Sequence, residues 1–327
     1  MAHVLPRAIA ILAALGFAAA PAAAQDDYPR RPITLIVPFA AGGPTDVISR
    51  IASDHMSRTL GQLIIIENVV GAGGTTASTR AARAAPDGYT IEMGHMGTHA
   101  ASVALYPNLA YKPDVDFAPI GLVAGTPVLI LGKKDFPPKD LKEFVAYVKA
   151  NVDKLNMAHA GVGSVSFTTC LLLNSILGIK PTSIPFNGTG PALTALISGQ
   201  VDYMCDQIVN IVQQVQAGQI KAYAVGTAER NPALPHVPTS KEAGLPEFQA
   251  QAWNALFAPK STPQPVLDKL SDALDKALDD EGTRKRLLEL GSVLPDKSGR
   301  GQQPLAALVK SEIDRWTPVI KAAGPLN

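Results

Sequence analysis

The chain has 327 residues, of which 29 are Lys or Arg and 28 are Asp or Glu, giving a formal net charge of +1. A balance this close to neutrality argues against nucleic acid or an anionic membrane surface as the main partner. The length allows one large domain or two ordinary ones.

The N-terminus has the features of a secretory signal peptide. Arg7 gives it a basic start, an apolar run covers residues 8–20, and small residues at 22–24 precede Gln25. The apolar run is well short of the about 20 residues that a bilayer span needs, and no later segment reaches that length. We therefore expect residues 1–24 to be cleaved near Ala24 and the mature protein to be periplasmic. Retention as a membrane anchor is the alternative.

Beyond this segment, apolar β-branched runs alternate with helical patterns. In chain order, strands are expected at 33–37, 63–67, 89–94, 120–123, 128–132, 156–160, 182–186, 201–205, 222–225 and 252–257. A helix with Val47, Ile48 and Ile51 on one face follows the first strand, and others are expected at 141–150, 167–177, 191–197, 208–217, 263–277, 283–290 and 305–323. This alternation is typical of an α/β fold with mainly parallel sheets.

Two of the strands run into similar glycine-rich turns, at residues 38–46 and 161–166. The first turn of a helix leaves backbone N–H groups without partners and carries a partial positive charge, which favours a carboxylate or phosphate. Small residues let a ligand approach the backbone closely, and hydroxyl side chains add hydrogen-bond donors. The residues of the two turns that we expect to contact an anion are Gly42, Gly43, Thr45, Gly161, Gly163, Ser164 and Ser166. Neither turn holds Lys or Arg, so the predicted anion site is neutral. The alternative is that both are ordinary strand-to-helix turns.

Asp46 closes the first turn at the start of a helix. A carboxylate is favoured there as a cap, but it would repel an anionic ligand. We therefore assign Asp46 to holding the loop.

A single ligand held by both turns requires the turns to face each other. Two α/β lobes that meet at the carboxyl ends of their strands would place them so. We expect a hinged monomer in which residues 25–125 and 226–327 form lobe one and residues 126–225 form lobe two.

Cys170 and Cys205 are the only cysteines. In an exported chain a disulfide between them is expected, which would close a loop of about 36 residues. Two buried free thiols or a metal pair are the alternatives. No third ligand lies at zinc-like spacing from them, and His95 and His99 follow a strand without an acidic partner, so we expect no metal.

A cofactor is not expected either. The turn at residues 71–75 is rich in glycine, but it lacks the downstream acid of a dinucleotide site and the lysine of a phosphate-binding loop. We interpret it as a close turn onto a helix.

Seven segments, taken in order, resemble one family. They are residues 28–46 (YPRRPITLIVPFAAGGPTD), 67–75 (ENVVGAGGT), 86–89 (PDGY), 185–192 (PFNGTGPA), 199–202 (GQVD), 238–244 (PTSKEAG) and 253–259 (WNALFAP). Together they resemble the tripartite tricarboxylate transporter receptors, also called Bug receptors. The resemblance implies a two-lobed periplasmic-binding-protein fold (Venus flytrap) with a hinge between its sheets. It also implies capture of a small organic carboxylate and delivery to a membrane permease of one large and one small subunit.

The resemblance also implies which residues contact the ligand. One carboxylate would be held by the loops at 39–46 and 161–166, which add Phe39, Ala40 and Val165 to the candidates. Further contacts would come from Thr98, His99, Asn187, Gly188, Thr189 and Asp206. The alternative for His99 is a structural role within its loop. The alternative for Asp206 is to accept hydrogen bonds from backbone N–H groups of the hinge. Many relatives carry His where this chain has Phe167, so a contact from that position is in doubt.

Two other functions remain as alternatives. A periplasmic ligand sensor that partners a membrane protein would need the same fold. A serine hydrolase using Ser164 or Ser166 would need a base, and His159 is the only nearby candidate; no Gly-x-Ser-x-Gly motif occurs. The sequence leaves the ligand open among aliphatic dicarboxylates, aromatic acids, hydroxy acids and amino acids.

Overall fold

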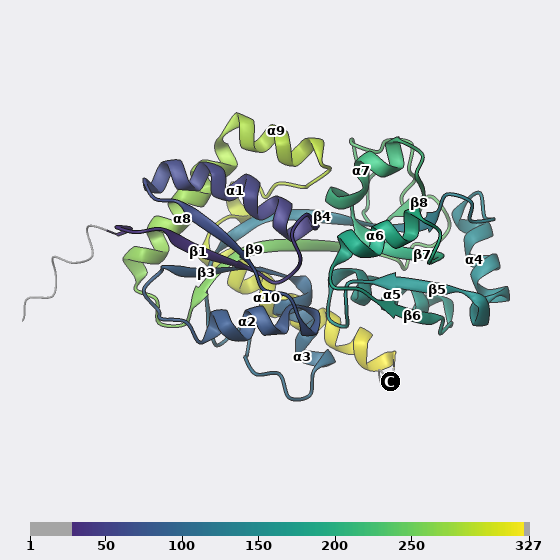
Figure 1. The fold of residues 1–327 in the computed structure, drawn as a ribbon, viewed down its shortest axis with the longest axis horizontal. Coiled ribbons are helices and arrows are strands. Elements are labelled where there is room, and N and C mark those ends of the chain that lie inside the picture. The colour runs from purple at the N-terminus through teal and green to yellow at the C-terminus, as the bar shows by residue number, and fades with distance from the viewer. Residues whose placement is uncertain (1–27, 324–327) are drawn as a thin grey trace, which may run out of the picture.

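The computed structural model describes residues 28–323, so the predicted signal peptide lies outside the described residues. Figure 1 shows two lobes side by side, with the long strand β4 (Phe117–Lys133) running through both. Residues 117–127 of β4 pair with β9 (Gln251–Pro259), whereas residues 128–133 pair with β7 (Tyr203–Gln207) and β8 (Ile220–Val225). The pairing partner therefore changes between Pro127 and Val128, in the middle of one continuous strand.

Lobe one contains the strands β1 (Ile33–Val37), β2 (Ile64–Asn68) and β3 (Thr90–His95), together with β9 and the first part of β4. Its helices are α1 (Pro44–Leu60), α2 (Thr75–Ala82), α3 (Ser102–Leu105), α8 (Gln264–Asp279), α9 (Glu281–Glu289) and α10 (Gln302–Ala322). Short helical turns at Ala72–Gly74 and Gly97–Ala101 precede α2 and α3. Helix α10 packs on β4 and its far end reaches lobe two.

Lobe two contains β5 (Asn156–His159), β6 (Thr182–Pro185), β7, β8 and the end of β4. Its helices are α4 (Leu141–Ala150), α5 (Val165–Leu177), α6 (Thr189–Ile197) and α7 (Ile208–Gln216). The strand order across both lobes is β2-β1-β3-β9-β4-β7-β5-β6, with β8 also paired to β4. The domain boundaries near Gly125 and Gly226 stay a prediction.

The predicted α/β alternation is confirmed, with two differences. The pairs of β1 with β2 and β3, and of β5 with β6 and β7, are parallel, but β4 and β9 make only antiparallel pairs, so the sheet is mixed rather than mainly parallel. The strands expected at 120–123 and 128–132 are one strand. The chain stays extended between them because Gly125 pairs with Trp253 and exchanges backbone hydrogen bonds of 2.7 and 2.8 Å with Val293.

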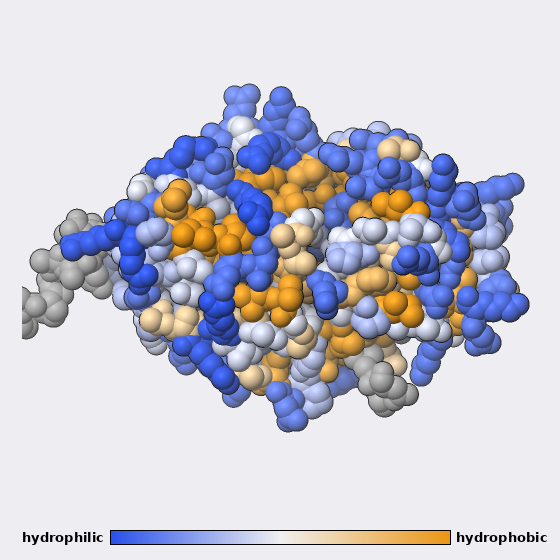
Figure 2. Space-filling view, in the orientation of Figure 1, coloured by the Kyte–Doolittle hydropathy of each residue, from blue (hydrophilic) through white to orange (hydrophobic). Residues whose placement is uncertain are grey.

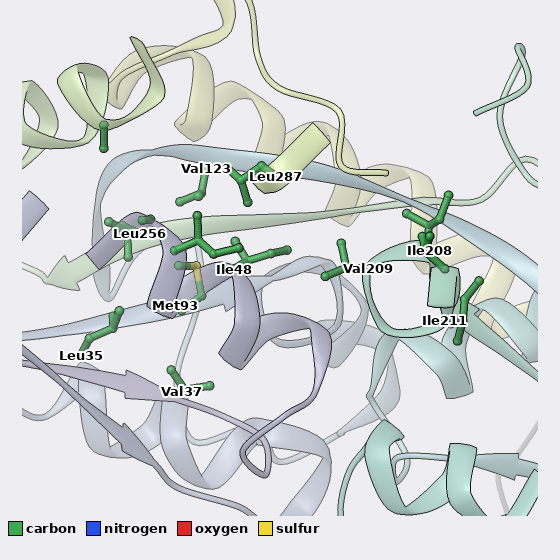
Figure 3. Packing of buried hydrophobic residues seen from close by; sticks show 14 of the residues in the cluster. Leu35, Val37, Ile48, Met93, Val123, Ile208, Val209, Ile211, Leu256 and Leu287 are labelled. Atoms are coloured by element: carbon green, nitrogen blue, oxygen red, sulfur yellow. The ribbon is translucent and has the colours of Figure 1, made fainter. Parts of the chain in front are cut away.

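The apolar core also crosses the boundary between the lobes. One cluster on a single face of the sheet includes Leu35, Ile48 and Met93 of lobe one and Ile208 and Ile211 of α7 (Figure 3). A second cluster covers the other face. Burial of such continuous apolar area stabilises the hinge region as part of the fold.

The predicted disulfide is present between Cys170 of α5 and Cys205 of β7, with a Cα–Cα distance of 5.3 Å. It joins the helix that begins at the second glycine turn to the strand that ends at Gln207. The disulfide thus links helix α5 covalently to strand β7 within lobe two.

On the face seen in Figure 2, hydrophilic residues surround separate apolar patches. Among the most exposed large apolar side chains are Leu63, just before the edge strand β2, and Ile65 within it. Within residues 28–323, no helix combines the length and apolar character required to cross a bilayer.

Candidate ligand-binding site between the lobes

Three helices begin at a small cavity between the lobes: α1 from lobe one, and α5 and α6 from lobe two. This inner cavity has a volume of about 10 Å³, roughly the room of one water-sized sphere. It is lined by Phe39, Pro44, Thr45, His95, Ala160, Ser164, Val165, Ser166, Thr189 and Gln207. Both glycine turns therefore contribute to one shared cavity, although they are more than 100 residues apart in sequence.

A wider pocket adjoins the inner cavity through Phe39 and Ala160, which line both. This outer pocket has a volume of about 260 Å³ and is lined by Phe39, Val70, Gly71, Ala72, Gly73, Gly74, Tyr106, Ala160, Gly161, Val162, Pro185, Phe186 and Asn187. It too contains residues of both lobes. Together the two spaces define the candidate site.

Electrostatically, the candidate site is positive without any cationic side chain. No Asp, Glu, Lys or Arg lines either space. The first-turn N–H groups of Thr45 in α1, Val165 and Ser166 in α5 and Thr189 in α6 have no intrahelical acceptor. Since three helix dipoles add their positive ends here, the arrangement favours an anion.

Asp46 holds the first glycine turn in place through hydrogen bonds to its carboxylate. Its carboxylate accepts hydrogen bonds from the Gly42 N–H at 2.9 Å, from Arg50 through two contacts of 2.9 Å, and from Asn68 Nδ2 at 3.0 Å. Burial alone would raise the pKa of Asp46, but these hydrogen bonds outweigh burial and hold the pKa below its usual value. Asp46 therefore stays ionised and fully engaged within the loop.

The second turn is held by its own serines. Ser164 Oγ donates to the Gly161 carbonyl at 2.7 Å and caps α5 by accepting from the Phe167 N–H at 3.2 Å. Ser166 Oγ accepts from the Ala160 N–H at 3.0 Å and lies 3.1 Å from Ser164 Oγ. These hydrogen bonds tie the turn to the start of α5, and both serines line the inner cavity.

The two lobes touch directly around the site. Gly188 of lobe two lies against Ala40, and Gly43 lies against Thr189. The closest approach is at Gly73, where a Cβ atom would lie 1.7 Å from the Val162 carbonyl oxygen of the other lobe. The lobes are therefore in direct contact around both spaces, which is a closed arrangement.

Tyr106 links the lobes at the outer pocket. Its hydroxyl lies 2.9 Å from the Ala72 carbonyl of lobe one and 2.5 Å from the Val162 carbonyl of lobe two. With a single proton, the hydroxyl donates to these two acceptors in turn. Tyr106 thus stabilises the closed arrangement.

Removing this hydroxyl tests that role. Tyr106→Phe should weaken ligand binding about three- to tenfold, since a hydrogen bond of this kind contributes about 0.5–1.5 kcal/mol. The matched control is Tyr147→Phe on α4, which lies far from the site and should leave the affinity unchanged in calorimetric titrations. Equal affinities for the two variants would contradict a closing role for Tyr106.

The structure places eight of the sixteen predicted contact residues at the wall of these two spaces. The inner cavity is lined by Phe39, Thr45, Ser164, Val165, Ser166 and Thr189, and the outer pocket by Phe39, Gly161 and Asn187. Ala40, Gly42, Gly43 and Gly163 belong to the two glycine turns and Gly188 precedes α6, and none of them lines either space. Ligand contact by these residues stays a prediction.

Thr98, His99 and Asp206, which the resemblance places at the ligand, are fully buried and line neither space, and ligand contact by them stays a prediction. The turn after β3 is a helical turn that points Thr98 and His99 inward, where His99 stacks on Phe257 with ring centroids 4.0 Å apart. Thr98 Oγ1 lies 3.0 Å from His99 Nδ1.

Asp206 makes hydrogen bonds within the hinge, which is the second of its two predicted roles. Its carboxylate accepts from the Gln207 N–H at 2.8 Å and from Asn210 Nδ2 of α7 at 2.6 Å. Burial raises its pKa to about 7, partly offset by these two hydrogen bonds.

Sequence reasoning missed several residues of the site, above all His95 and Gln207. Each is the last residue of its strand, β3 or β7, and the carboxyl ends of strands are where ligands bind in α/β folds. The predicted strands stopped one or two residues too early to show this. The turn at 71–74, interpreted as structural, and Tyr106 line the outer pocket as well.

A larger pocket of about 680 Å³ lies on lobe two, among α5, β5, β6 and the end of α10. No residue of the first glycine turn lines it, and none of the three helix N-termini converges there. The space between the lobes is therefore the better candidate for an anion site.

Comparison with known proteins agrees with this geometry. The family model described as "Tripartite tricarboxylate transporter family receptor" matches residues 48–325. The chain is similar to the solved structure of MatC (Rpa3494) from Rhodopseudomonas palustris with bound malate, with 55% identity and a TM-score of 0.88 over 90% of this chain and 100% of that one.

Two further structures are similar over nearly the same range. The periplasmic binding protein BugD has 43% identity and a TM-score of 0.87, covering 91% of this chain and 99% of its own. R. palustris Rpa4515 with adipate has 31% identity and a TM-score of 0.86, with coverage of 91% and 99%. These matches confirm the two-lobed periplasmic-binding-protein fold. Because the family model spans most of the sequence, the chain belongs to the tripartite tricarboxylate transporter receptor family.

Proposed function

We propose that this chain is an exported receptor that captures a small organic carboxylate between its lobes and delivers it to a membrane permease of the tripartite tricarboxylate type. The observation that carries the proposal is the meeting of three helix N-termini and four hydroxyl side chains around one cavity without charged groups. Thr45, Ser164, Ser166 and Thr189 supply the hydroxyls.

Neutral donors are sufficient for such binding. A hydrogen bond to a charged group contributes about 1.5–3 kcal/mol. Four or five such bonds to one buried carboxylate can supply much of the roughly 8 kcal/mol of micromolar binding after ordering costs. The dipoles of α1, α5 and α6 add to this attraction.

The similar structures support the same class of ligand. One is described with bound malate and another with adipate, and both of these are dicarboxylates. The similarity covers 90% and 91% of this chain rather than a single motif. We extend from those proteins only the general class, a small organic acid.

Delivery to a permease fits the closed arrangement of the lobes. Ligand that binds both turns favours closure, and closure creates a surface that differs from the open form. A permease that recognises the surface of the closed form would therefore bind the ligand-loaded receptor in preference to the empty one. The receptor would act as a periplasmic monomer after cleavage near Ala24, with lobe boundaries near Gly125 and Gly226.

The hydrogen bonds of the turn favour binding over hydrolysis. Ser164 and Ser166 contact each other and backbone groups, and His159 Nδ1 accepts from the Gly161 N–H at 3.0 Å. Nucleophilic catalysis would require a base directed at a serine hydroxyl. The Ser164 proton is taken by the Gly161 carbonyl, so Ser166, which accepts from the Ala160 N–H, is the serine left to donate to an anion.

A thermal-shift screen of small carboxylates tests the proposal. A ligand at a hundred times its Kd should stabilise the folded protein by about 2.7 kcal/mol. Thr189→Val, which removes one hydroxyl at the cavity, should weaken binding about tenfold. Thr194→Val, one turn further along the exposed face of α6, is the matched control and should bind normally.

Stabilisation by sugars or amines but by no acid would overturn the assignment. Transport and sensing are separated in a deletion strain of the native host. Loss of uptake of the bound acid supports transport, whereas unchanged uptake with a lost transcriptional response supports a sensor.

A further inference from the structure

We propose that the pocket on lobe two is a second ligand site, separate from the space between the lobes, and that it binds an acid with a large apolar body. This lobe-two pocket, among α5, β5, β6 and the end of α10, has a volume of about 680 Å³. Cavities of this size enclose small molecules in other proteins. Binding there would be independent of the capture proposed between the lobes.

Apolar side chains make most of the wall of the lobe-two pocket. They come from α5, from β5 and from the loop that joins α5 to β6, and they are Met157, Phe167, Leu171, Ile179 and Pro181. Phe167 and Leu171 are four residues apart on α5 and therefore lie on the same side of the helix. Leu171 and Ile179 are only partly buried, so an apolar ligand would remove more of their surface from water.

His159 brings a buried hydrogen-bond donor to this pocket. The residue is 2% exposed, and its Nδ1 accepts from the Gly161 N–H at 3.0 Å, so the proton of the neutral ring is assigned to Nε2. Burial lowers the pKa of His159 to about 4, which keeps the ring neutral at pH 7. Nε2 makes no hydrogen bond within residues 28–323. A buried donor without an acceptor is unfavourable, and a ligand oxygen would satisfy it.

Lys180 supplies the one full charge among the residues that line the pocket. Its side chain is exposed, and it makes no ion pair or hydrogen bond in the part of the chain that the structure describes. Of the described residues, no Asp or Glu lines the pocket. Two carbonyls at the end of α5 are already used, because Ser175 accepts from the Gly178 N–H and Asn174 from the Ile179 N–H. The pocket therefore favours an anionic group over a cationic one.

The lobe-two pocket adjoins the candidate site without being part of it. Ala160 lines the space between the lobes and its neighbour His159 lines the lobe-two pocket, as expected where successive residues of an extended chain face opposite sides. Val162 and Pro185 line both the lobe-two pocket and the outer pocket. A ligand on lobe two would thus contact the second glycine turn on the side away from the inner cavity.

Three probes with one chain and different head groups test the ligand class. Octanoate, octan-1-ol and octylammonium share an eight-carbon chain and end in a carboxylate, a hydroxyl and an ammonium group. Calorimetric titration of the unmodified protein at pH 7 should find octanoate at least about fivefold tighter than the alcohol, with octylammonium the weakest. Absence of octanoate binding, or octylammonium binding as tight as octanoate, overturns the proposal.

Charge reversal tests the part of Lys180. Lys180→Glu should weaken octanoate at least about tenfold and strengthen octylammonium, because each head group then meets the opposite sign of charge. The matched control is Lys149→Glu on α4, which changes the net charge equally at an exposed lysine of lobe two that does not line the pocket. It should change either affinity by less than about twofold. Equal octanoate affinities for the two variants contradict the assignment.

Two further variants locate the bound probe. Leu171→Gln should weaken octanoate and octan-1-ol alike, about fivefold, since both bury the same chain against α5. Thr189→Val should leave octanoate binding unchanged, because Thr189 lines the inner cavity and not the lobe-two pocket. If Thr189→Val weakens octanoate while Leu171→Gln and Lys180→Glu do not, octanoate binds between the lobes. The lobe-two site is then wrong, and carboxylate capture still stands.

Discussion

Replacing Gly73 with alanine is expected to weaken carboxylate binding at least about a hundredfold. The new Cβ would lie 1.7 Å from the Val162 carbonyl oxygen of the opposite lobe and 2.8 Å from the Tyr106 hydroxyl. A backbone carbonyl cannot yield as a flexible side chain does, so the lobes cannot reach the closed arrangement. Because affinity falls in proportion to the population of the competent form, the loss appears in the measured Kd.

The control for this variant must share its backbone strain. Gly73 has a φ of 62°, and an L-residue in that region costs about 1–2 kcal/mol. Gly61→Ala has nearly the same φ, 68°, and nothing within 4 Å of the added Cβ. Both variants should lose similar stability in urea, and only Gly73→Ala should lose affinity. Small-angle scattering with saturating ligand would then show a more extended Gly73→Ala protein; equal affinities would disprove the clash.

Removing the disulfide is expected to lower the free energy of unfolding by about 3–4 kcal/mol in the chain-entropy description. The bond joins residues 35 apart in sequence and ties α5 to β7. Without it, the start of α5 and Gln207 at the end of β7 are less firmly held together, so ligand affinity should fall as well. The measurement is urea unfolding and titration of the Cys170→Ala, Cys205→Ala double variant.

Reduction of the unmodified protein provides the matched comparison. A thiol reductant should bring its unfolding midpoint toward that of the double variant and should leave the variant itself unaffected. If the oxidised protein and the double variant unfold at the same urea concentration, the bond contributes no stability.

Much of the fold could be predicted because the spacing of apolar residues and the residues that begin and end helices and strands are local properties of the sequence. The strand at Ile33–Val37 and the helix at Leu141–Ala150 were predicted at their observed bounds. The continuous strand β4 was predicted as two strands because residues 124–127 resemble a loop between them. They stay extended only because β9 and Val293 supply hydrogen-bond partners from distant parts of the chain.

The same distinction applies to the candidate site. The glycine turns were recognisable since their small residues and following helices are contiguous. His95 was considered only as half of a metal pair, and Gln207 was not considered. Nothing in the local sequence indicates that β3 and β7 end at the same cavity, or that Thr98 and His99 turn inward on a helical turn.

By itself, the sequence determined the α/β alternation and the neutral glycine turns, because each depends on residue types at short range. It made the disulfide an expectation, and the structure shows the bond. Tertiary structure alone decided which groups line the inner cavity. Strand alternation and long-range pairing direct His95 and Gln207 into the cavity and Asp206 away from it. The hydrogen-bond state of a buried side chain depends on neighbours that only folding brings together.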